Sequence, residues 1–107
     1  MTQNNKSDCE KIIIQVDSSI EDLIPIFLRS RQKDIKDILH ALEQGDFETI
    51  LFVGHNMRGS GGGYGFDYLS ETGFILELAA KEKDVEKIRK QIHEIVNYLE
   101  KIEIVYV

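Results

Sequence analysis

The sequence predicts an all-α protein, an antiparallel four-helix bundle, to which short β-strands near the two termini are added. Apolar residues recur at intervals of three and four along four successive segments, which is the spacing of amphipathic helices. Helix-ending and helix-capping residues separate the segments, at Gly45-Asp46, in the glycine cluster 59–65, and at Lys83-Asp84. The connections are therefore short, and short connections favour antiparallel neighbours in a bundle.

The first helical segment is expected to begin at residues 18–21, which have the form of a capping box. In such a box Ser18 accepts a hydrogen bond from a first-turn amide and Glu21 reaches back to the cap. The apolar spacing then continues until Gly45. Pro25 lies inside the segment, where it removes one backbone hydrogen bond and crowds the preceding turn. The sequence leaves two alternatives open, a short separate first helix or a kink in a longer one.

Three further helices follow from the same spacing. The second is capped by Asp46 and reaches Gly61, the third runs from Asp67 to about Lys83, and the fourth is capped by Asp84. The four apolar faces are expected to form one core. Its expected members are Ile20, Leu23, Ile24, Phe27, Leu28, Ile35, Ile38, Leu39, Leu42, Phe47, Ile50, Val53, Met57, Leu69, Leu76, Ala79, Ala80, Val85, Ile88, Ile92, Ile95, Leu99 and Ile102.

The two ends of the chain differ from the helical middle. Residues 11–17 and 103–107 are rich in β-branched residues and are predicted to be short strands. Either these strands pair with each other or each covers one end of the bundle. Residues 1–10 are polar and aperiodic, so we expect a flexible N-terminal tail followed by a single domain over residues 11–107.

Length and charge limit the classes of function. The chain has 107 residues, with 19 acidic and 13 basic side chains and a formal net charge of -6, and its basic residues are scattered among acids. We therefore expect no nucleic-acid partner. The single cysteine, Cys9, has no partner for a disulfide and fits a reducing compartment. No apolar run is long enough for a signal sequence or a membrane span, so a cytoplasmic location is expected.

His55 is the residue whose setting points to chemistry. On a helix with the core residues Ile50, Val53 and Met57, His55 projects about 150° away from the core direction. Its side chain should therefore be exposed to solvent. A histidine that is partly neutral at physiological pH has a nucleophilic ring nitrogen and needs no helper base.

The neighbours of His55 on the helix surface are unusual for an exposed face. They lie three, four and seven residues away and are Leu51, Phe52, Arg58, Gly59 and Gly62. The first two offer apolar surface, and the glycines remove side chains at about 1 kcal/mol each in helix propensity. A partner protein is therefore expected to dock here. Arg58 supplies a cation one turn from His55, suited to a phosphoryl group on the ring.

These residues lie in a longer pattern, His55-Asn56-Met57-Arg58-Gly59-Ser60 followed by Tyr64-Gly65-Phe66, Leu69-Ser70 and Leu76-Glu77. The pattern resembles the signature of histidine-containing phosphotransfer (HPt) domains, and the resemblance runs from about Ile20 to Leu99. It implies that His55 accepts the phosphoryl group, that Arg58 assists it, and that Gly59 leaves room for the partner. Arginine replaces the commoner lysine at position 58, which preserves the charge.

The resemblance also implies the mechanism and the partners. A receiver domain would bring its phosphoaspartate and bound magnesium to His55, and the phosphohistidine would later serve another receiver, with a sensor histidine kinase upstream. The chain would then be a phosphocarrier, not an enzyme, and a monomer without a cofactor of its own.

The same residues allow other interpretations. The chain could be a phosphorylation-independent binding module that uses the same face to sequester a kinase or a response regulator. An autonomous enzyme is disfavoured because no catalytic dyad is present, and the glycine cluster lacks the spacing of a nucleotide-binding loop. His40 and His93 are interpreted as ordinary surface residues. No acidic cluster has the spacing of a metal site, and Asp84, Glu86, Glu94 and Glu100 are expected to be solvated.

Overall fold

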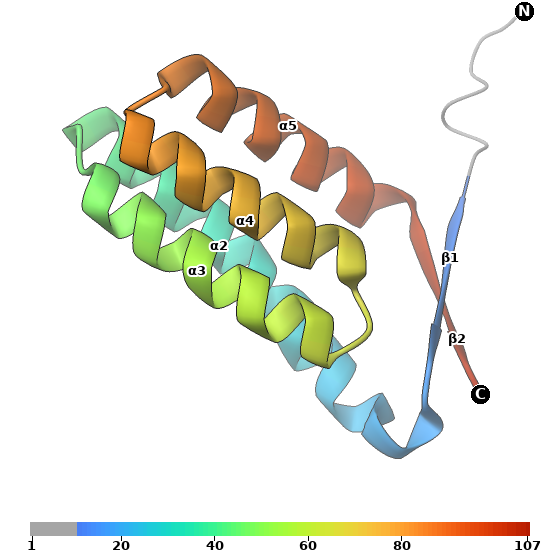
Figure 1. Ribbon diagram of the computed structural model, residues 1–107. Coiled ribbons are helices and arrows are strands. Elements are labelled where there is room, and N and C mark those ends of the chain that lie inside the picture. Colours follow the sequence, from blue (N-terminus) through green and yellow to red (C-terminus); the bar gives the residue numbers. More distant parts are fainter. Residues whose placement is uncertain (1–10) are drawn as a thin grey trace, which may run out of the picture.

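The computed structural model describes residues 11–107, and the predicted tail over residues 1–10, with Cys9, lies outside this range. Four α-helices run alternately up and down and form an antiparallel bundle, which confirms the predicted fold class (Figure 1). The elements in chain order are β1 (Ile12–Val16), the 3₁₀ helix η1 (Ser18–Leu23), α2 (Ile24–Gln44), α3 (Phe47–Gly63), α4 (Asp67–Glu82), α5 (Val85–Lys101) and β2 (Ile102–Tyr106).

The start of the helical region differs from the predicted capping box. Asp17, not Ser18, is the N-cap, and its carboxylate accepts a hydrogen bond of 2.9 Å from the Ser19 amide. Aspartate is as good an N-cap as serine and stands one residue earlier, so the predicted Ser18–Glu21 exchange does not form. Pro25 lies in the first turn of α2, where a missing amide proton does no harm. Of the two alternatives, the structure therefore has the short separate helix.

The predicted helix ends at the other junctions are confirmed. Gly45 ends α2 in the left-handed conformation with φ of 69°, and the Asp46 carboxylate accepts from the Thr49 amide at 3.2 Å. Asp84 caps α5 in the same way. The glycine cluster does not interrupt α3, which continues to Gly63.

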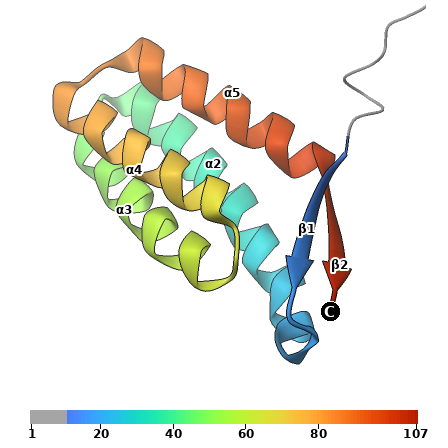
Figure 2. The ribbon, with the colours of Figure 1, turned by 45° about the vertical axis from the view of Figure 1, so that its right-hand side comes forward.

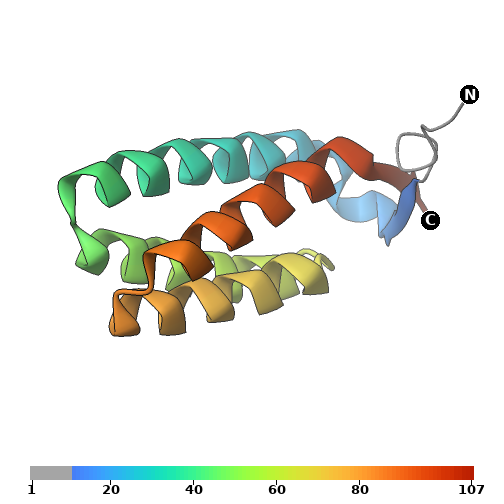
Figure 3. The same cartoon turned by 90° about the horizontal axis from the view of Figure 1, so that it is seen from above.

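The core lies between the four helices, and α5 runs between α2 and α4 when seen from above (Figure 3). Most predicted core residues are buried. Leu23, Leu39 and Val85 are exceptions, 45%, 43% and 36% exposed. Val85 is the first residue of α5, directly after the Asp84 cap. Leu23 belongs to η1, which contributes no buried side chain, and Leu39 is rotated by about 100° from the buried Ile38.

Arg31, which the apolar spacing places in a core position, is buried as a charged residue. Its guanidinium lies 4.6 Å from the centre of the Phe27 ring, bonds to the Asp34 carboxylate at 2.7 Å and donates to the Ser60 hydroxyl of α3 at 2.9 Å. Burial raises the pKa of Asp34, and the attraction of Arg31 opposes that rise. The buried cation is thus paired with a carboxylate of its own helix and ties α2 to α3.

Helices α3 and α4 make the closest contact in the bundle, and glycines make it possible. A Cβ atom on Gly73 would lie 2.6 Å from the carbonyl oxygen of Gly54, and one on Gly54 would lie 2.9 Å from the carbonyl oxygen of Gly73. A Cβ on Gly61 would lie 2.8 Å from the backbone nitrogen of Ser70. These distances are too short for any side chain, so the two backbones touch directly.

The terminal strands pair with each other. β1 and β2 form a two-stranded parallel sheet in which Ile12 is opposite Ile102 and Val16 is opposite Tyr106. The sheet stands at one end of the bundle, with β1 between β2 and the start of α4 (Figure 2). Because the chain enters through β1 and leaves through β2, the sheet joins the two ends of the described chain.

We predict opposite effects for alanine at two glycines of the same helix. Gly54→Ala should lower the free energy of unfolding by about 1–3 kcal/mol, because its methyl group forces α3 and α4 apart. Gly59→Ala should raise it by up to about 1 kcal/mol, because alanine favours the helix and its Cβ meets no described atom within 4 Å. Urea denaturation of the two variants measures both values, and equal effects would refute the close helix contact.

Candidate functional site

The candidate site is centred on His55, in the middle of α3. Its side chain is 63% exposed, whereas Ile50 and Met57 on the same helix are fully buried. The orientation predicted from the helical phase is therefore confirmed. The imidazole stands on the outer surface of the bundle, where another protein can reach it.

Glu77 of α4 joins the two residues that the sequence singled out. Its Oε2 lies 3.3 Å from the Nδ1 of His55, and its Oε1 accepts from the Nη1 of Arg58 at 3.4 Å. The Glu77 side chain is only 12% exposed, so it is held firmly while both of its partners are accessible. No chemical role for Glu77 follows from the sequence, where the one signal is its place in the Leu76-Glu77 pair of the HPt-like pattern.

The glycine contact between the helices sets the position of Glu77. The backbone nitrogen of Glu77 lies 3.0 Å from where a Cβ of Gly54 would stand, and Gly54 directly precedes His55. A larger residue at Gly54 would therefore press against the part of α4 that carries Glu77. Spacing along one helix cannot reveal this contact, because the two residues are 22 positions apart.

Arg58 is held by α4 at several points. Its guanidinium lies 4.7 Å from the centre of the Phe74 ring and donates to Glu77, and its backbone carbonyl accepts from the Ser70 hydroxyl at 2.7 Å. The Arg58 side chain is still 49% exposed. The cation is thus aligned beside His55 and remains available to a second anion.

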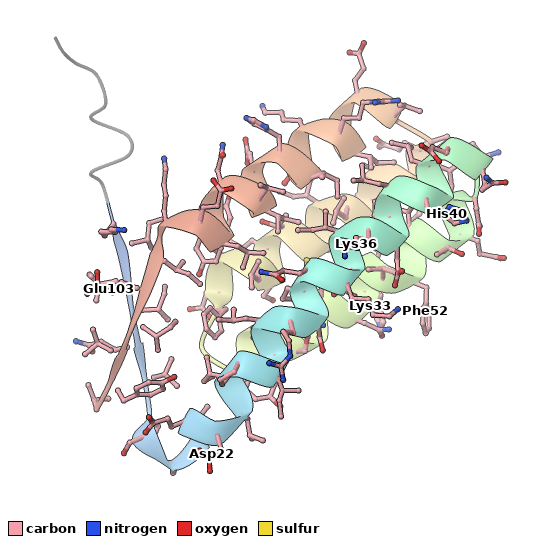
Figure 4. The ribbon with its side chains drawn as sticks, turned by 180° about the vertical axis from the view of Figure 1, so that it is seen from behind. Asp22, Lys33, Lys36, His40, Phe52 and Glu103 are labelled. Atoms are coloured by element: carbon pink, nitrogen blue, oxygen red, sulfur yellow. The ribbon has the colours of Figure 1, made fainter. Side chains whose placement is uncertain are left out.

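The other residues predicted to contact a partner differ in their exposure to solvent. Phe52 is 63% exposed and points away from the bundle (Figure 4). Gly59 and Gly62 lie on the exposed side of α3, and a Cβ at Gly62 would meet only the Ser70 hydroxyl, at 3.8 Å. Leu51 differs, because it is partly buried and packs against the core. The open surface around the imidazole is therefore formed by Phe52 and the two glycines.

The other two histidines have simpler surroundings. His40 is exposed near the end of α2 (Figure 4), and exposed His93 interacts with Asn97 at 3.3 Å. Within residues 11–107, neither contacts a carboxylate or an arginine. The combination of exposed ring, carboxylate and guanidinium is therefore found only around His55 in this part of the chain.

Residues 11–107 contain neither a cluster of metal-binding side chains nor a helix suited to crossing a membrane. Across residues 11–107, no three side chains of the metal-binding types converge on a point that could hold an ion. None of the helices in this range has the length and apolar character that crossing a lipid bilayer requires. Of the acidic residues predicted to be solvated, Glu94 is partly buried and accepts from the Tyr68 hydroxyl at 3.3 Å.

Comparison with known families decides the class of protein. The model of the Hpt domain matches residues 22–103, which is most of the chain. The chain belongs to the Hpt domain family. Membership implies histidine phosphotransfer in two-component signalling, in which Hpt domains act as phosphocarriers between receiver domains and kinases. Neither a curated protein nor a solved structure gives a significant match.

In this Hpt domain the contact with Glu77 should fix which ring nitrogen of His55 carries the proton. Because the carboxylate accepts from Nδ1, the neutral ring should carry its proton on Nδ1 and leave the Nε2 lone pair free. We predict mainly the Nδ1–H form at about pH 9, where a free histidine is neutral. Long-range ¹H–¹⁵N NMR distinguishes the two forms.

The matched variant for this prediction is Glu77→Leu. It removes the acceptor and should shift the neutral His55 ring towards the Nε2–H form. If the wild type and Glu77→Leu show the same ring spectrum, the carboxylate does not control the proton.

Proposed function

We propose that His55 is the phosphoacceptor of this Hpt domain, receiving a phosphoryl group from the phosphoaspartate of one receiver domain and passing it to another receiver. The observation that carries the proposal is the exposed imidazole whose Nδ1 contacts Glu77 while Arg58 shares the same carboxylate. Such an arrangement gives the ring a free nucleophilic nitrogen, a counter-ion and a nearby cation.

In the phosphoryl-transfer step this chain supplies the nucleophile and the charged groups beside it. The Nε2 lone pair of His55 attacks the phosphorus in line, a P–N bond forms, and the P–O bond to the receiver aspartate breaks to release a carboxylate. The ring keeps its Nδ1 proton and becomes positively charged. Glu77, at 3.3 Å from Nδ1, offsets that charge. Transfer onward reverses the same steps with a second receiver.

Arg58 is proposed to exchange partners during the step. In the unphosphorylated chain its guanidinium donates to Glu77 over the Phe74 ring. A phosphoryl group on Nε2 brings two negative charges within one helical turn, and guanidinium binds phosphate oxygens well. Arg58 then holds the phosphoryl group and Glu77 turns fully to the imidazolium.

The surface around His55 is proposed to bind receiver domains and a sensor histidine kinase. Phe52 supplies exposed apolar area, and Gly59 and Gly62 let a partner backbone approach the ring. Magnesium belongs to the receiver site in this proposal, and the chain acts as a monomer with no cofactor of its own. A relay of this kind relies on positioning and electrostatics, because the receiver brings the catalytic groups.

Replacing the nucleophile tests the proposal. His55→Gln should abolish phosphorylation by a purified receiver domain that has been phosphorylated with acetyl phosphate, while its circular dichroism and thermal melting stay near wild type. The readout is acid-labile, alkali-stable phosphate on the chain. His40→Gln and His93→Gln are matched controls and should accept phosphate normally, and loss in either control would contradict the assignment to His55.

The same experiment separates relay from sequestration. A binding module would hold the receiver or the kinase tightly and gain no phosphate on His55. Phosphate that appears on the chain and then on a second, unphosphorylated receiver supports the relay and gives the direction of transfer for that pair.

A second prediction concerns access to the ring. Gly59→Glu should leave folding intact, because a Cβ at this position meets no described atom within 4 Å. Phosphoryl transfer from the receiver should fall at least about tenfold, through bulk and like charge at the docking face. Lys90→Gln is the control, because it makes the net charge more negative by the same one unit at an exposed position of α5, away from this face. Unchanged transfer by Gly59→Glu would exclude docking over this glycine.

A further inference from the structure

A groove of about 470 Å³ borders the sheet on the side of β1. Its walls come from three elements, with Ile12 and Ile14 on β1, Asp67 and Tyr68 at the start of α4, and Glu94 and Tyr98 on α5. β1 stands beside the start of α4 in Figure 2. None of the lining residues bonds to His55, Arg58 or Glu77, so the groove is separate from the phosphotransfer site.

One edge of β1 has no strand partner among residues 11–107. The Val16 carbonyl accepts from the Val107 amide and the Ser18 amide donates to the Val107 carbonyl, both at 2.9 Å. Alternate residues direct their backbone groups to opposite edges of a strand, so the backbone N–H and C=O groups of Ile12, Ile14 and Val16 point to β2. The backbone groups of Ile13 and Gln15 point to the other edge, where the described sheet has no third strand.

The groove continues the inner face of the sheet beyond this edge. Ile12 lies on the face towards the bundle, yet it remains 37% exposed because the groove opens beside it. The rings of Tyr68 and Tyr98 stack at 4.5 Å and form an aromatic wall. The buried Tyr98 hydroxyl has no hydrogen-bond partner among the described residues, and burial raises its pKa to about 12, so it stays a proton donor.

We propose that the free edge of β1 and this groove together bind an extended segment of a partner protein, which adds to the sheet as a third strand. The backbone of the segment pairs with Ile13 and Gln15. Every second side chain enters the groove, where the apolar and aromatic walls require apolar residues. One groove-facing position is basic, because the carboxylates of Asp67 and Glu94 outnumber the single ammonium of Lys101 there.

A second copy of this chain fits the edge less well than a peptide does. Antiparallel pairing of β1 with another β1 puts both bundles on the same face of the joined sheet. The start of α4 already borders β1 on that face, so the second bundle would collide with it. A single extended segment carries no bundle. The surface therefore suits a linker or terminal segment of another protein.

The test uses the full chain and a synthetic peptide, acetyl-Thr-Val-Thr-Val-Thr-Arg-amide, in which valine, valine and arginine share one face. Amide exchange by NMR should show Ile12, Ile14 and Val16 protected in the free protein and Ile13 and Gln15 unprotected. Saturating peptide should slow exchange at Ile13 and Gln15 by about tenfold or more. The same peptide with N-methylated backbone amides should not bind.

Protein variants test the edge and the charge separately. Ile13→Pro removes an outward amide and leaves the bonds to β2, so peptide binding should be lost while Ile12, Ile14 and Val16 stay protected. Glu94→Lys should weaken binding about threefold, and Glu100→Lys on the same helix should not. Phosphoryl acceptance by His55 should be unchanged in all three, so the outcome is independent of the proposed phosphotransfer.

Several results would overturn the proposal. These are no binding at millimolar peptide, equal binding of the N-methylated peptide, and bound peptide that leaves Ile13 and Gln15 unprotected. Concentration-dependent dimerisation that protects the same two amides without peptide would assign the edge to a second copy. If the Ile14 amide also loses its protection in Ile13→Pro, the variant has disturbed the pairing of β1 with β2. The comparison of the plain and the N-methylated peptide on the wild-type chain then tests the backbone pairing.

Discussion

The direct contact between the backbones of α3 and α4 is the constraint on which the rest of this structure depends. Gly54 and Gly73 face each other so closely that neither position has room for a Cβ atom. Because of this contact, a side chain of α4 can reach a ring on the outer face of α3. The same pair of helices therefore supplies core packing on one side and the candidate site on the other.

The site combines one nearly buried side chain, Glu77, with two exposed ones, His55 and Arg58. Glu77 is nearly buried, and the two groups that it contacts are largely exposed. A fixed carboxylate orients the ring at no further entropic cost when a partner arrives, which is a form of preorganisation. The arrangement suits a phosphocarrier, which has to serve partners that bring their own catalytic groups.

Much of the fold could be predicted because it follows from local rules. Helical spacing, the left-handed Gly45 and the caps at Asp46 and Asp84 are signals within a few residues of one another. The exposure of His55 followed from helical phase in the same way. The N-cap at Asp17 was missed because two capping residues compete there, and Leu39 was misplaced because it flanks the apolar stripe.

What the sequence could not supply is contact between distant segments. The parallel pairing of β1 with β2 joins strands from opposite ends of the chain, and the choice between pairing and separate strands has no local signal. The position of Glu77 beside His55 depends in turn on how closely two helices approach. The family resemblance includes Glu77 in its pattern, and the close packing of Gly54 on Gly73 explains why the Glu77 side chain reaches His55.

In the proposed mechanism, Glu77 leaves the Nε2 of His55 free to take the phosphoryl group. The most direct measurement is ¹H, ¹⁵N and ³¹P NMR of the chain after phosphorylation by a receiver domain, which identifies both the modified residue and the ring nitrogen. We expect phosphorus coupled to Nε2 of His55 and a proton retained on Nδ1. Phosphate on Nδ1, or on His40 or His93, would contradict this account.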